Sequence, residues 1–328
     1  MAVNPMSMAP MAAPPPERVP RLRWRPTRQA DLPECMPLVP PWLGLSSAER
    51  AALPALWAQI VNAPAIYSMV IEDLGLAPGQ RVQAWGVAMA LAPEWVARWS
   101  LDHRPEPLIV ARVYRALLAG ETLMDETSFG RVNACGELSM LCLHYGMHYA
   151  DIEHPYVQAL IAAGNESMRF GMSGHQLSAL YYENAAESDG WMRAAGFLQR
   201  SMPEAAPLHY WGMSRAEAMR TIPGSTARQL FESHPPRFRL SVSQRRLLWR
   251  ALFDEDDARL AQDLGVSAHG LKKLWRGIYE RVSDVVPDFF GDAGGEDDGK
   301  RGPEKRRQVL AYVRQRPEEL RPWVGAAA

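Results

Sequence analysis

Basic side chains gather around a glycine turn near the end of this 328-residue chain. In the stretch LAQDLGVSAHGLKKLWRGIYERV, from Leu260 to Val282, Gly265 ends one helical pattern and Ser267 can cap the next. Three basic residues fall outside the apolar stripe of the later helix: Lys272, Lys273 and Arg276. Because cations that neutralise phosphates release counterions from DNA, this arrangement predicts a helix that enters the major groove.

The residues around the turn match a known pattern of DNA-binding proteins. Its entry, its Ile-Ala pair and its Leu-Gly-Val-Ser turn correspond to Leu240 and Ser241, Leu260 and Ala261, and residues 264–267. This segment resembles the helix-turn-helix domain of LuxR-type transcriptional regulators, and a partial resemblance to sigma factors implies the same docking. Two residues depart from the pattern, since Gly270 replaces a Thr and Leu274 replaces a His.

The resemblance implies that the start of the third helix reads DNA. The residues that it assigns to this contact are Ser267, His269, Gly270, Lys272, Lys273 and Arg276. A glycine inside a helix costs about 1 kcal/mol relative to alanine, so Gly270 either allows close approach to the DNA backbone or weakens the contact. The alternative is a helical hairpin with a solvated basic face, which is typical of a structural adaptor.

Residues capable of catalysis or metal binding also occur in the middle of the chain. His144 and His148 share one face of a strand and could hold a metal, but hydrogen-bonded pocket residues explain them better, and we expect no metal site. Cys135 and Cys142 could act as nucleophiles, yet their spacing supports only buried thiols, so we assign no catalytic residue. Five aromatic residues either line an apolar ligand pocket or pack in the core: Tyr145, Tyr149, Tyr181, Tyr182 and Trp191.

The elements that must position these groups are strands and helices in alternation. Runs rich in apolar and β-branched residues predict strands at Leu22–Arg25 and over RVQAWGVAMAL, PLIVARVYRALL, GELSMLCLHYGMHY and LSALYYEN. Helices are predicted after Asp31, after a cap at Ser46 or Ser47, from His154 to Met172, and over ESDGWMRAAGFLQ. The run from Leu108 to Leu118 could equally begin as a strand and end as a helix.

The order of these elements from Leu22 to Phe197 is similar to the GNAT N-acetyltransferase fold. RWRPTRQADLPEC is like the opening strand and helix of that family, and LYYENAAESDGWMRAAGF is like its closing pair. The family binds the acetyl-CoA pyrophosphate at a glycine-bearing loop before a helix. The corresponding loop here, MHYADIEHP, has no glycine and carries Asp151 and Glu153, while RFGMSG, at Arg169–Gly174, leaves no room for the helix that must follow. We therefore expect a degraded site, no cofactor and a sensor rather than an enzyme.

The composition is that of a soluble globular protein. The chain is 47% hydrophobic and 22% charged with a formal net charge of -1, which excludes a wholly basic nucleic-acid coat. The three cysteines have no CxxC spacing, so they indicate neither a disulfide framework nor a cysteine-rich zinc site. The most apolar run, Ala84–Pro93, has about half of the ~20 residues that a membrane helix needs. These features predict a cytoplasmic protein with no membrane partner.

Composition and pattern divide the chain into folded and flexible parts. We predict a disordered tail (1–20), a GNAT-like sensor domain (21–205), a connector (206–236), a LuxR-like helix-turn-helix (237–290), a flexible linker (291–302) and a C-terminal helix and tail (303–328). The predicted fold class is α+β, a mixed sheet with flanking helices, followed by an all-α helix-turn-helix domain.

Together the two resemblances predict a DNA-binding transcriptional regulator without enzymatic activity. A small-molecule effector would bind the N-terminal domain, and a homodimer would read double-stranded DNA. The alternative is an acyl-CoA-dependent N-acyltransferase with a C-terminal interaction domain. An affinity for acetyl-CoA that is lost on mutating the loop around Asp151 would favour this alternative.

Overall fold

The computed structural model describes residues 19–103, 105–200, 208–253, 255–291 and 298–325. The predicted disordered tail (1–20) lies outside these residues except for 19 and 20, and residues 292–297 of the predicted flexible linker (291–302) lie outside them as well. The rest of that linker prediction is corrected, because residues 298–302 belong to a helix, α13 (Asp298–Gln315). None of the helices in these ranges is both long and apolar enough to cross a membrane.

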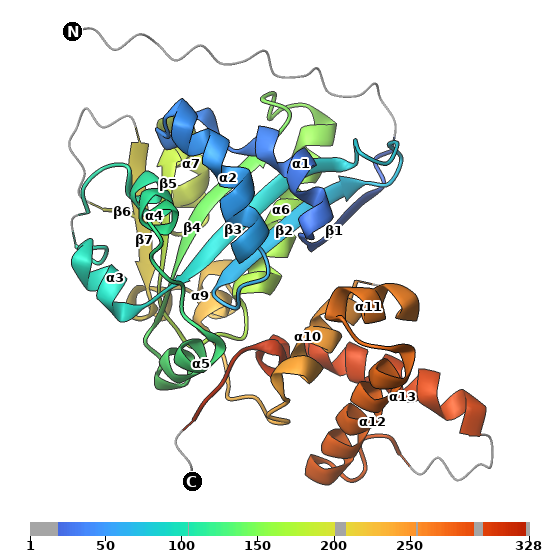
Figure 1. Cartoon of the computed structure of the whole chain (residues 1–328). Helices are drawn as coiled ribbons and strands as arrows, with labels where there is room; N and C mark the ends of the chain where they lie inside the picture. Colours follow the sequence, from blue (N-terminus) through green and yellow to red (C-terminus); the bar gives the residue numbers. More distant parts are fainter. Residues whose placement is uncertain (1–18, 104, 201–207, 254, 292–297, 326–328) are drawn as a thin grey trace, which may run out of the picture.

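A seven-stranded sheet forms the centre of the N-terminal part (Figure 1). Its strands are β1 (Leu22–Pro26), β2 (Ile66–Asp73), β3 (Val82–Leu91), β4 (Leu138–Met147), β5 (Leu177–Ala185), β6 (Leu198–Gln199) and β7 (Leu208–Ser214). The strands lie in the order β1-β2-β3-β4-β5-β7-β6. All neighbours are antiparallel except β4 and β5, which are parallel because a long helix returns the chain between them.

Helices cover both faces of this sheet. They are α1 (Leu32–Cys35), α2 (Ser47–Ile60), α3 (Pro93–Arg98), α4 (Ile109–Leu118), α5 (Glu126–Cys135), α6 (Pro155–Met172), α7 (Asp189–Ala194), α8 (Arg215–Ala218) and α9 (Thr226–Phe231). In Figure 1, α2 and α4 lie in front of the sheet and α6 lies behind it. The predicted mixed sheet with flanking helices is confirmed.

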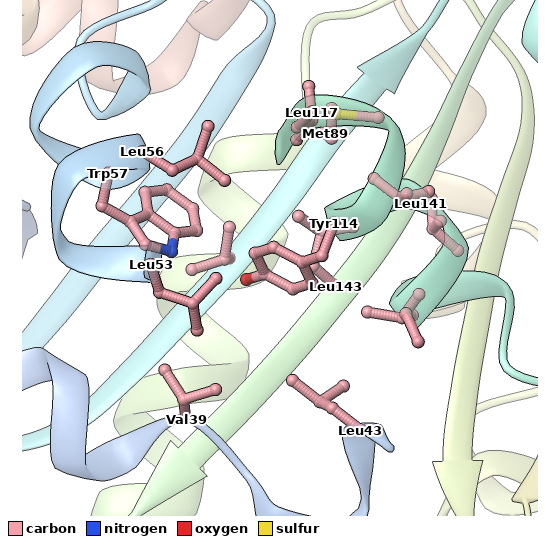
Figure 2. Packing of buried hydrophobic residues seen from close by; sticks show 14 of the residues in the cluster. Val39, Leu43, Leu53, Leu56, Trp57, Met89, Tyr114, Leu117, Leu141 and Leu143 are labelled. Carbon is pink, nitrogen blue, oxygen red and sulfur yellow. The ribbon is translucent and has the colours of Figure 1, made fainter. Parts of the chain in front are cut away.

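The front face holds the largest buried cluster of the sheet domain (Figure 2). The ring of Trp57 on α2 lies edge-on to Trp85 on β3, with centroids 4.8 Å apart, and faces Tyr114 on α4 at 6.2 Å. All three side chains are fully buried. Helix α2 begins where predicted, because Ser46 accepts a hydrogen bond from the Glu49 backbone and the Glu49 carboxylate accepts one from Ser46. Apolar burial on this face therefore fixes α2 and α4 against the sheet.

The structure corrects three predicted elements. The run Pro107–Leu118 is not a strand: α4 forms because the Glu183 carboxylate accepts from the backbone N–H of Ile109 and Val110, each at 3.0 Å, and so caps the helix. Strand β2 was not predicted at all. Strand β7 lies in the predicted connector (206–236), where it pairs with β5, so the sheet extends beyond residue 205.

Four helices form the C-terminal part: α10 (Val242–Ala251), α11 (Asp257–Leu264), α12 (Ala268–Val285) and α13 (Asp298–Gln315). Gly265 ends α11 with a left-handed φ of 65°, and Ser267 caps α12 by accepting from the Gly270 N–H at 3.1 Å. On α12 Trp275 is buried, whereas Leu274 is half-buried. The predicted all-α C-terminal part is confirmed.

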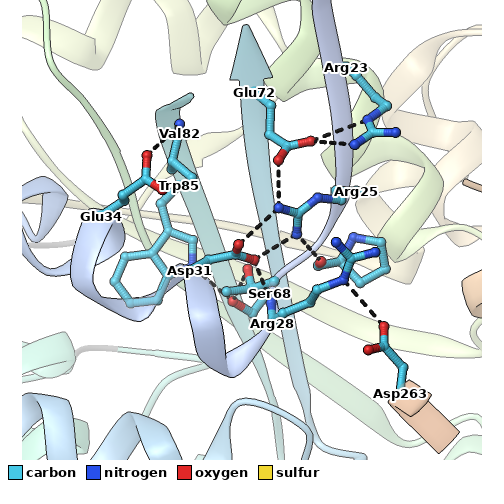
Figure 3. Close-up of polar contacts among 12 residues, drawn as sticks. Arg23, Arg25, Arg28, Asp31, Glu34, Ser68, Glu72, Val82, Trp85 and Asp263 are labelled. Atoms are coloured by element: carbon cyan, nitrogen blue, oxygen red, sulfur yellow. Dashed lines mark hydrogen bonds and ion pairs between the residues drawn. The ribbon is translucent and has the colours of Figure 1, made fainter. Parts of the chain in front are cut away.

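The C-terminal helices pack directly on the sheet domain. Arg28, after β1, forms an ion pair with Glu255 and reaches the Asp263 carboxylate of α11 at 3.3 Å (Figure 3). Nearby, Trp24 on β1 meets Phe253 edge-on, with ring centroids 5.0 Å apart. These contacts combine aromatic burial with charge pairing, so the two parts share one interface.

Candidate functional site

A cavity of about 310 Å³ lies where β4 and β5 separate. Its walls come from β2, β3, β4, β5, α6 and the start of α7. The lining is mainly apolar and includes Met69, Ile71, Met147, Ile161, Met168 and Met172. Ligand pockets commonly have volumes of about 300–1,000 Å³ and combine apolar walls with a few polar groups. The cavity therefore has the size and lining of a small-molecule site.

The strands diverge at this cavity because their pairing stops early. The parallel ladder ends at Cys142 on β4 and Tyr182 on β5, although β4 continues to Met147 and β5 to Ala185. The register between β3 and β4 also shifts between Val87 and Ala88, which marks a bulge in β4. A bulge turns side chains and backbone groups out of the regular ladder. Beyond Cys142, the backbone of β4 therefore no longer pairs with β5, and this unpaired part of β4 lines the cavity through His144, Tyr145 and Met147.

Two polar groups that line the cavity have no nitrogen or oxygen hydrogen-bond partner in the described part of the chain, although the Cys142 thiol interacts with the first of them. They are the hydroxyl of Tyr182 and the Nε2 atom of His144, and both atoms are buried. Burial raises the pKa of Tyr182 well above its ordinary value and lowers the pKa of His144 to about 3. Both side chains are therefore neutral near pH 7. Because unpartnered buried polar atoms are rare, these two are candidates for contact with a ligand.

Three of the five predicted pocket aromatics line this cavity, namely Tyr145, Tyr182 and Trp191. The other two serve the core. The Tyr149 hydroxyl donates to Gln83 Oε1 at 2.7 Å, and Tyr181 donates to Asp102. Strand β2, which the sequence analysis missed, adds Tyr67, Met69 and Ile71 to the lining. The short apolar run with β-branched and aromatic residues in IYSMVIED was the available signal for that strand.

The surroundings of the cysteines and histidines bear on the nucleophile and the metal site that the sequence analysis considered. Burial raises the pKa of Cys142 to about 12, which opposes a thiolate nucleophile there, while Cys135 is exposed rather than buried as expected. His144 Nδ1 lies 3.2 Å from the Tyr114 hydroxyl, and His148 packs against the ring of Tyr149. No group of three His, Cys, Asp or Glu side chains with metal-binding geometry occurs within the described ranges.

The loop before α6 does not fit the pyrophosphate of acetyl-CoA. As predicted, the loop lies between β4 and α6 and is free of glycine. His154 caps α6 by accepting from the Tyr156 N–H at 3.1 Å, and the Asp151 carboxylate accepts from the Glu153 N–H at 3.1 Å. Side chains of this chain thus occupy backbone donors that a phosphate would need, and Asp151 and Glu153 are exposed beside them.

The residues predicted to contact DNA lie around the N-terminal half of α12. Ser267, His269, Lys272, Lys273 and Arg276 are exposed, and Gly270 is half-buried. Near Gly270, an added Cβ would lie 3.4 Å from Val266, an ordinary contact. DNA contact by these residues stays a prediction from the sequence pattern. None of them lines the cavity between β4 and β5.

Comparisons with known proteins find neither a matching family model nor a matching curated protein. Among solved structures, a spermidine N-acetyltransferase SpeG variant from Vibrio cholerae matches with a TM-score of 0.34 and 10% identity, covering 59% of this chain and 94% of that one. FeeM, an N-acyl amino acid synthase from uncultured soil microbes, matches with a TM-score of 0.32 and 9% identity, covering 62% of this chain and 97% of that one.

These findings correct two predictions. The structures named above are those of a spermidine N-acetyltransferase and an N-acyl amino acid synthase, and neither is a transcriptional regulator. The prediction of a regulator without enzymatic activity is therefore wrong. The GNAT-like element order of the sheet domain agrees with the sequence analysis, whereas neither of the two named structures supports a LuxR-type domain in the C-terminal helices.

Proposed function

We propose that this protein is an N-acyltransferase that holds the acyl group of a thioester in the cavity between β4, β5 and α6. The observation that carries the proposal is the divergence of β4 and β5 after Cys142 and Tyr182, directly beside an apolar cavity. This divergence leaves β4 backbone donors next to a space that fits an acyl chain. Such donors stabilise the oxyanion that forms when a nucleophile attacks a carbonyl carbon.

The Tyr182 hydroxyl and His144 Nε2 orient the leaving sulfur and the attacking amine. The amine nitrogen attacks the thioester carbonyl, the new C–N bond forms, the C–S bond breaks, and the proton lost by the amine leaves with the thiol. The Tyr182 hydroxyl donates a hydrogen bond to the leaving sulfur, because burial keeps this phenol protonated. His144 Nε2 hydrogen-bonds the incoming amine and orients it toward the carbonyl.

The proposal concerns the thioester end of the donor. Because the loop at Asp151 and Glu153 does not fit a pyrophosphate, no step depends on the nucleotide part of coenzyme A. A short thioester that lacks this part should therefore serve as a donor about as well as the corresponding acyl-CoA. This expectation differs from that for a GNAT enzyme with an intact phosphate loop.

The test is release of free thiol from two octanoyl thioesters, one of coenzyme A and one of N-acetylcysteamine. Spermidine and a panel of amino acids, the acceptor classes in the names of the two matched enzymes, are supplied as amines. We expect amine-dependent thiol release from both donors, with formation of the N-acyl product shown by mass spectrometry. No amine-dependent release from either donor would refute the proposal.

The substitution Tyr182→Phe removes only the hydroxyl that faces the leaving sulfur. We expect kcat to fall about 100-fold, the lower end of what a positioned proton donor contributes. Tyr279→Phe is the matched control, because its hydroxyl donates to Gly302 O at 3.2 Å and lies outside the cavity. Equal rates for Tyr182→Phe and Tyr279→Phe would exclude this role of Tyr182.

A further inference from the structure

A second cavity, of about 390 Å³, lies between the sheet domain and the C-terminal helices. The sheet domain contributes the loop after α2 and the beginning of β2, from Val61 to Ser68. The opposite wall comes from α10, the end of α11 and the segment Leu320–Pro322. Neither part of the chain encloses this cavity alone.

The lining of this cavity carries more cations than anions. Its charged residues are Arg245, Arg246, Arg250, Arg321, Glu126 and Asp263. Both carboxylates already have partners: Glu126 pairs with Arg245, and Asp263 lies 3.3 Å from Arg28 and 3.3 Å from Arg259. Arg246, Arg250 and Arg321 form no ion pair within the described ranges, although Asp263 and Glu255 attract Arg250 and Glu318 attracts Arg321 from a longer distance.

Arg321 is the most deeply placed of these cations. It is only 6% exposed, and its guanidinium lies 5.9 Å from the ring centroid of Phe170 and 5.4 Å from that of Trp249. Its Nε atom donates to Ser173 O at 2.9 Å and Nη2 donates to Phe170 O at 2.6 Å. Burial lowers the pKa of Arg321 to about 10, so the group stays charged near pH 7. A buried cation whose hydrogen bonds go to carbonyls and not to a carboxylate is well placed to bind an anion.

Two arginines of α10 complete the positive wall. Arg250 donates from Nη2 to Asn62 Oδ1 at 3.1 Å, but its Nη1 atom is buried and has no partner among the described residues. Arg246 is exposed at the cavity and forms no hydrogen bond or ion pair within the described ranges. A planar guanidinium presents paired N–H groups that match the oxygens of a carboxylate or phosphate. The cavity thus offers several N–H donors on cationic side chains, and these donors have no partner within the described ranges.

Apolar side chains from both domains also line the cavity, beside the polar Thr27, Asn62 and Ser68. The apolar ones include Val61, Ile66, Phe129, Met140 and Leu264. His175 also lines the cavity, and its Nδ1 donates to Met172 O at 3.0 Å, which leaves the neutral Nε2 as an acceptor. A small inorganic ion would contact the arginines but not the apolar side chains of the cavity. A ligand with an anionic head and an apolar body would use both surfaces.

We propose that this cavity binds a small organic anion, with its phosphate or carboxylate head on Arg246, Arg250 and Arg321 and its apolar part against Phe129 and Met140. Because the walls belong to two parts of the chain, the bound anion bridges the sheet domain and the C-terminal helices. Ligands that bind only the docked arrangement stabilise it by mass action. This proposal is independent of the acyl-transfer activity.

The test is isothermal titration of the full-length protein with phenyl phosphate, benzoate, inorganic phosphate and uncharged benzyl alcohol. We expect phenyl phosphate or benzoate to bind at micromolar to millimolar concentrations, and benzyl alcohol not to bind. The titration with the better of the two aromatic anions is repeated with Arg246→Ala, which removes an exposed cation that has no contact to lose in the folded protein. Its Kd should rise on the order of tenfold, because hydrogen bonds to charged groups are among the strongest in proteins.

Lys273→Ala is the control, since Lys273 is an exposed cation that does not line the cavity. Its Kd should equal that of the unmodified protein. Equal weakening by Lys273→Ala and Arg246→Ala would mean nonspecific attraction and would overturn the proposal. Binding by none of the anions would overturn it as well. Inorganic phosphate that binds as tightly as phenyl phosphate would show a site for the free ion and contradict the organic ligand.

Discussion

The two cavities of this molecule differ in chemistry and in how they are built. The first is largely apolar and lies within the sheet domain, between adjacent strands and the helix α6 that follows β4. The second carries arginines and exists only where α10 and α11 meet the beginning of β2. The first cavity therefore depends on local strand pairing, whereas the second depends on docking of the C-terminal helices. Conditions that weaken docking should affect the second cavity first.

One side chain lines both cavities. Tyr67 on β2 is part of each lining, and its hydroxyl donates to the Ser167 carbonyl on α6. Gly171, one turn further along α6, leaves the space that the Tyr67 ring fills, because a Cβ at Gly171 would lie 1.9 Å from the Tyr67 Cζ atom. Tyr67 therefore separates the two cavities physically. The following variants test whether the cavities are also separate in stability and in function.

The largest expected effect is that of Arg321→Met. The substitution keeps an apolar stem but removes the donors to Ser173 O and Phe170 O, two carbonyls held by this side chain. We expect the free energy of unfolding to fall by about 3 kcal/mol, because these acceptors lose charge-assisted hydrogen bonds. Urea unfolding gives the measurement. If the docked helices unfold first, a separate transition will appear while thiol release persists.

Arg316→Met is the matched control for that variant. The Arg316 side chain is 53% exposed and lies 3.7 Å from Glu318, so its loss should change stability by no more than about 0.5 kcal/mol. A loss of stability as large as that of Arg321→Met would contradict the special role given to the buried arginine.

A smaller effect is expected from Gly171→Ala, which places a methyl group against Tyr67. Alanine favours a helix, but overpacking costs about 1–3 kcal/mol, and we expect a net loss of about 2 kcal/mol. Because Tyr67 borders both cavities, thiol release and phenyl phosphate binding should weaken together. Gly190→Ala on α7 is the control, since nothing lies within 4 Å of a Cβ there. A change in only one of the two functions would show that Tyr67 does not couple the cavities.

The sequence was sufficient for the parts of the fold that local pattern determines. The capping box at Ser46 and the cap at Ser267 were visible as residue types at fixed spacing, and both helices begin there. The run from Ile109 to Leu118 shows the limit of such patterns. Its helix is capped by Glu183, a residue more than 70 positions later in the chain, and no local pattern contains that contact.

The candidate site was only partly accessible from the sequence for the same reason. Tyr182 and Trp191 were recognised as possible pocket residues, but the separation of β4 from β5 is a property of pairing between strands. The second cavity was missed entirely. Its Arg250 and Arg321 come from a helix and a tail far apart in the chain, and their burial results from docking against the sheet domain. Charge that is dispersed along a sequence gives no sign of such a cluster.

The pH dependence of stability tests the apolar cavity. Its expected effect on the free energy of unfolding is similar to that of Gly171→Ala. The folded protein keeps the pKa of His144 at about 3, below its ordinary value of 6.5, because the ring is buried. The unfolded chain therefore binds this proton more readily, and the stability from neutral His144 is present above pH 6.5 and lost as the pH falls. Between pH 7 and pH 5 this residue should account for a loss of about 2 kcal/mol.

His144→Gln should remove that part of the pH dependence, as measured by urea unfolding at several pH values. His175 also has a pKa well below its ordinary value through burial, so a smaller dependence of the same sign should remain. His269→Gln, at an exposed position on α12, is the control and should leave the dependence unchanged. If His144→Gln behaves like this control, then His144 is not buried and neutral beside the cavity.

The smallest effect is expected from replacing Lys272, Lys273 and Arg276 together by alanine. These side chains are exposed on α12, form no hydrogen bond or ion pair with the sheet domain within the described ranges, and line neither cavity. Surface substitutions of this kind usually change stability by about 0.5 kcal/mol or less, and alanine favours a helix. Urea unfolding, thiol release and phenyl phosphate binding should therefore all match those of the unmodified protein. A loss of thiol release with unchanged stability would mean that the C-terminal helices take part in the reaction, and the two cavities could then no longer be treated as the only functional surfaces of the described chain.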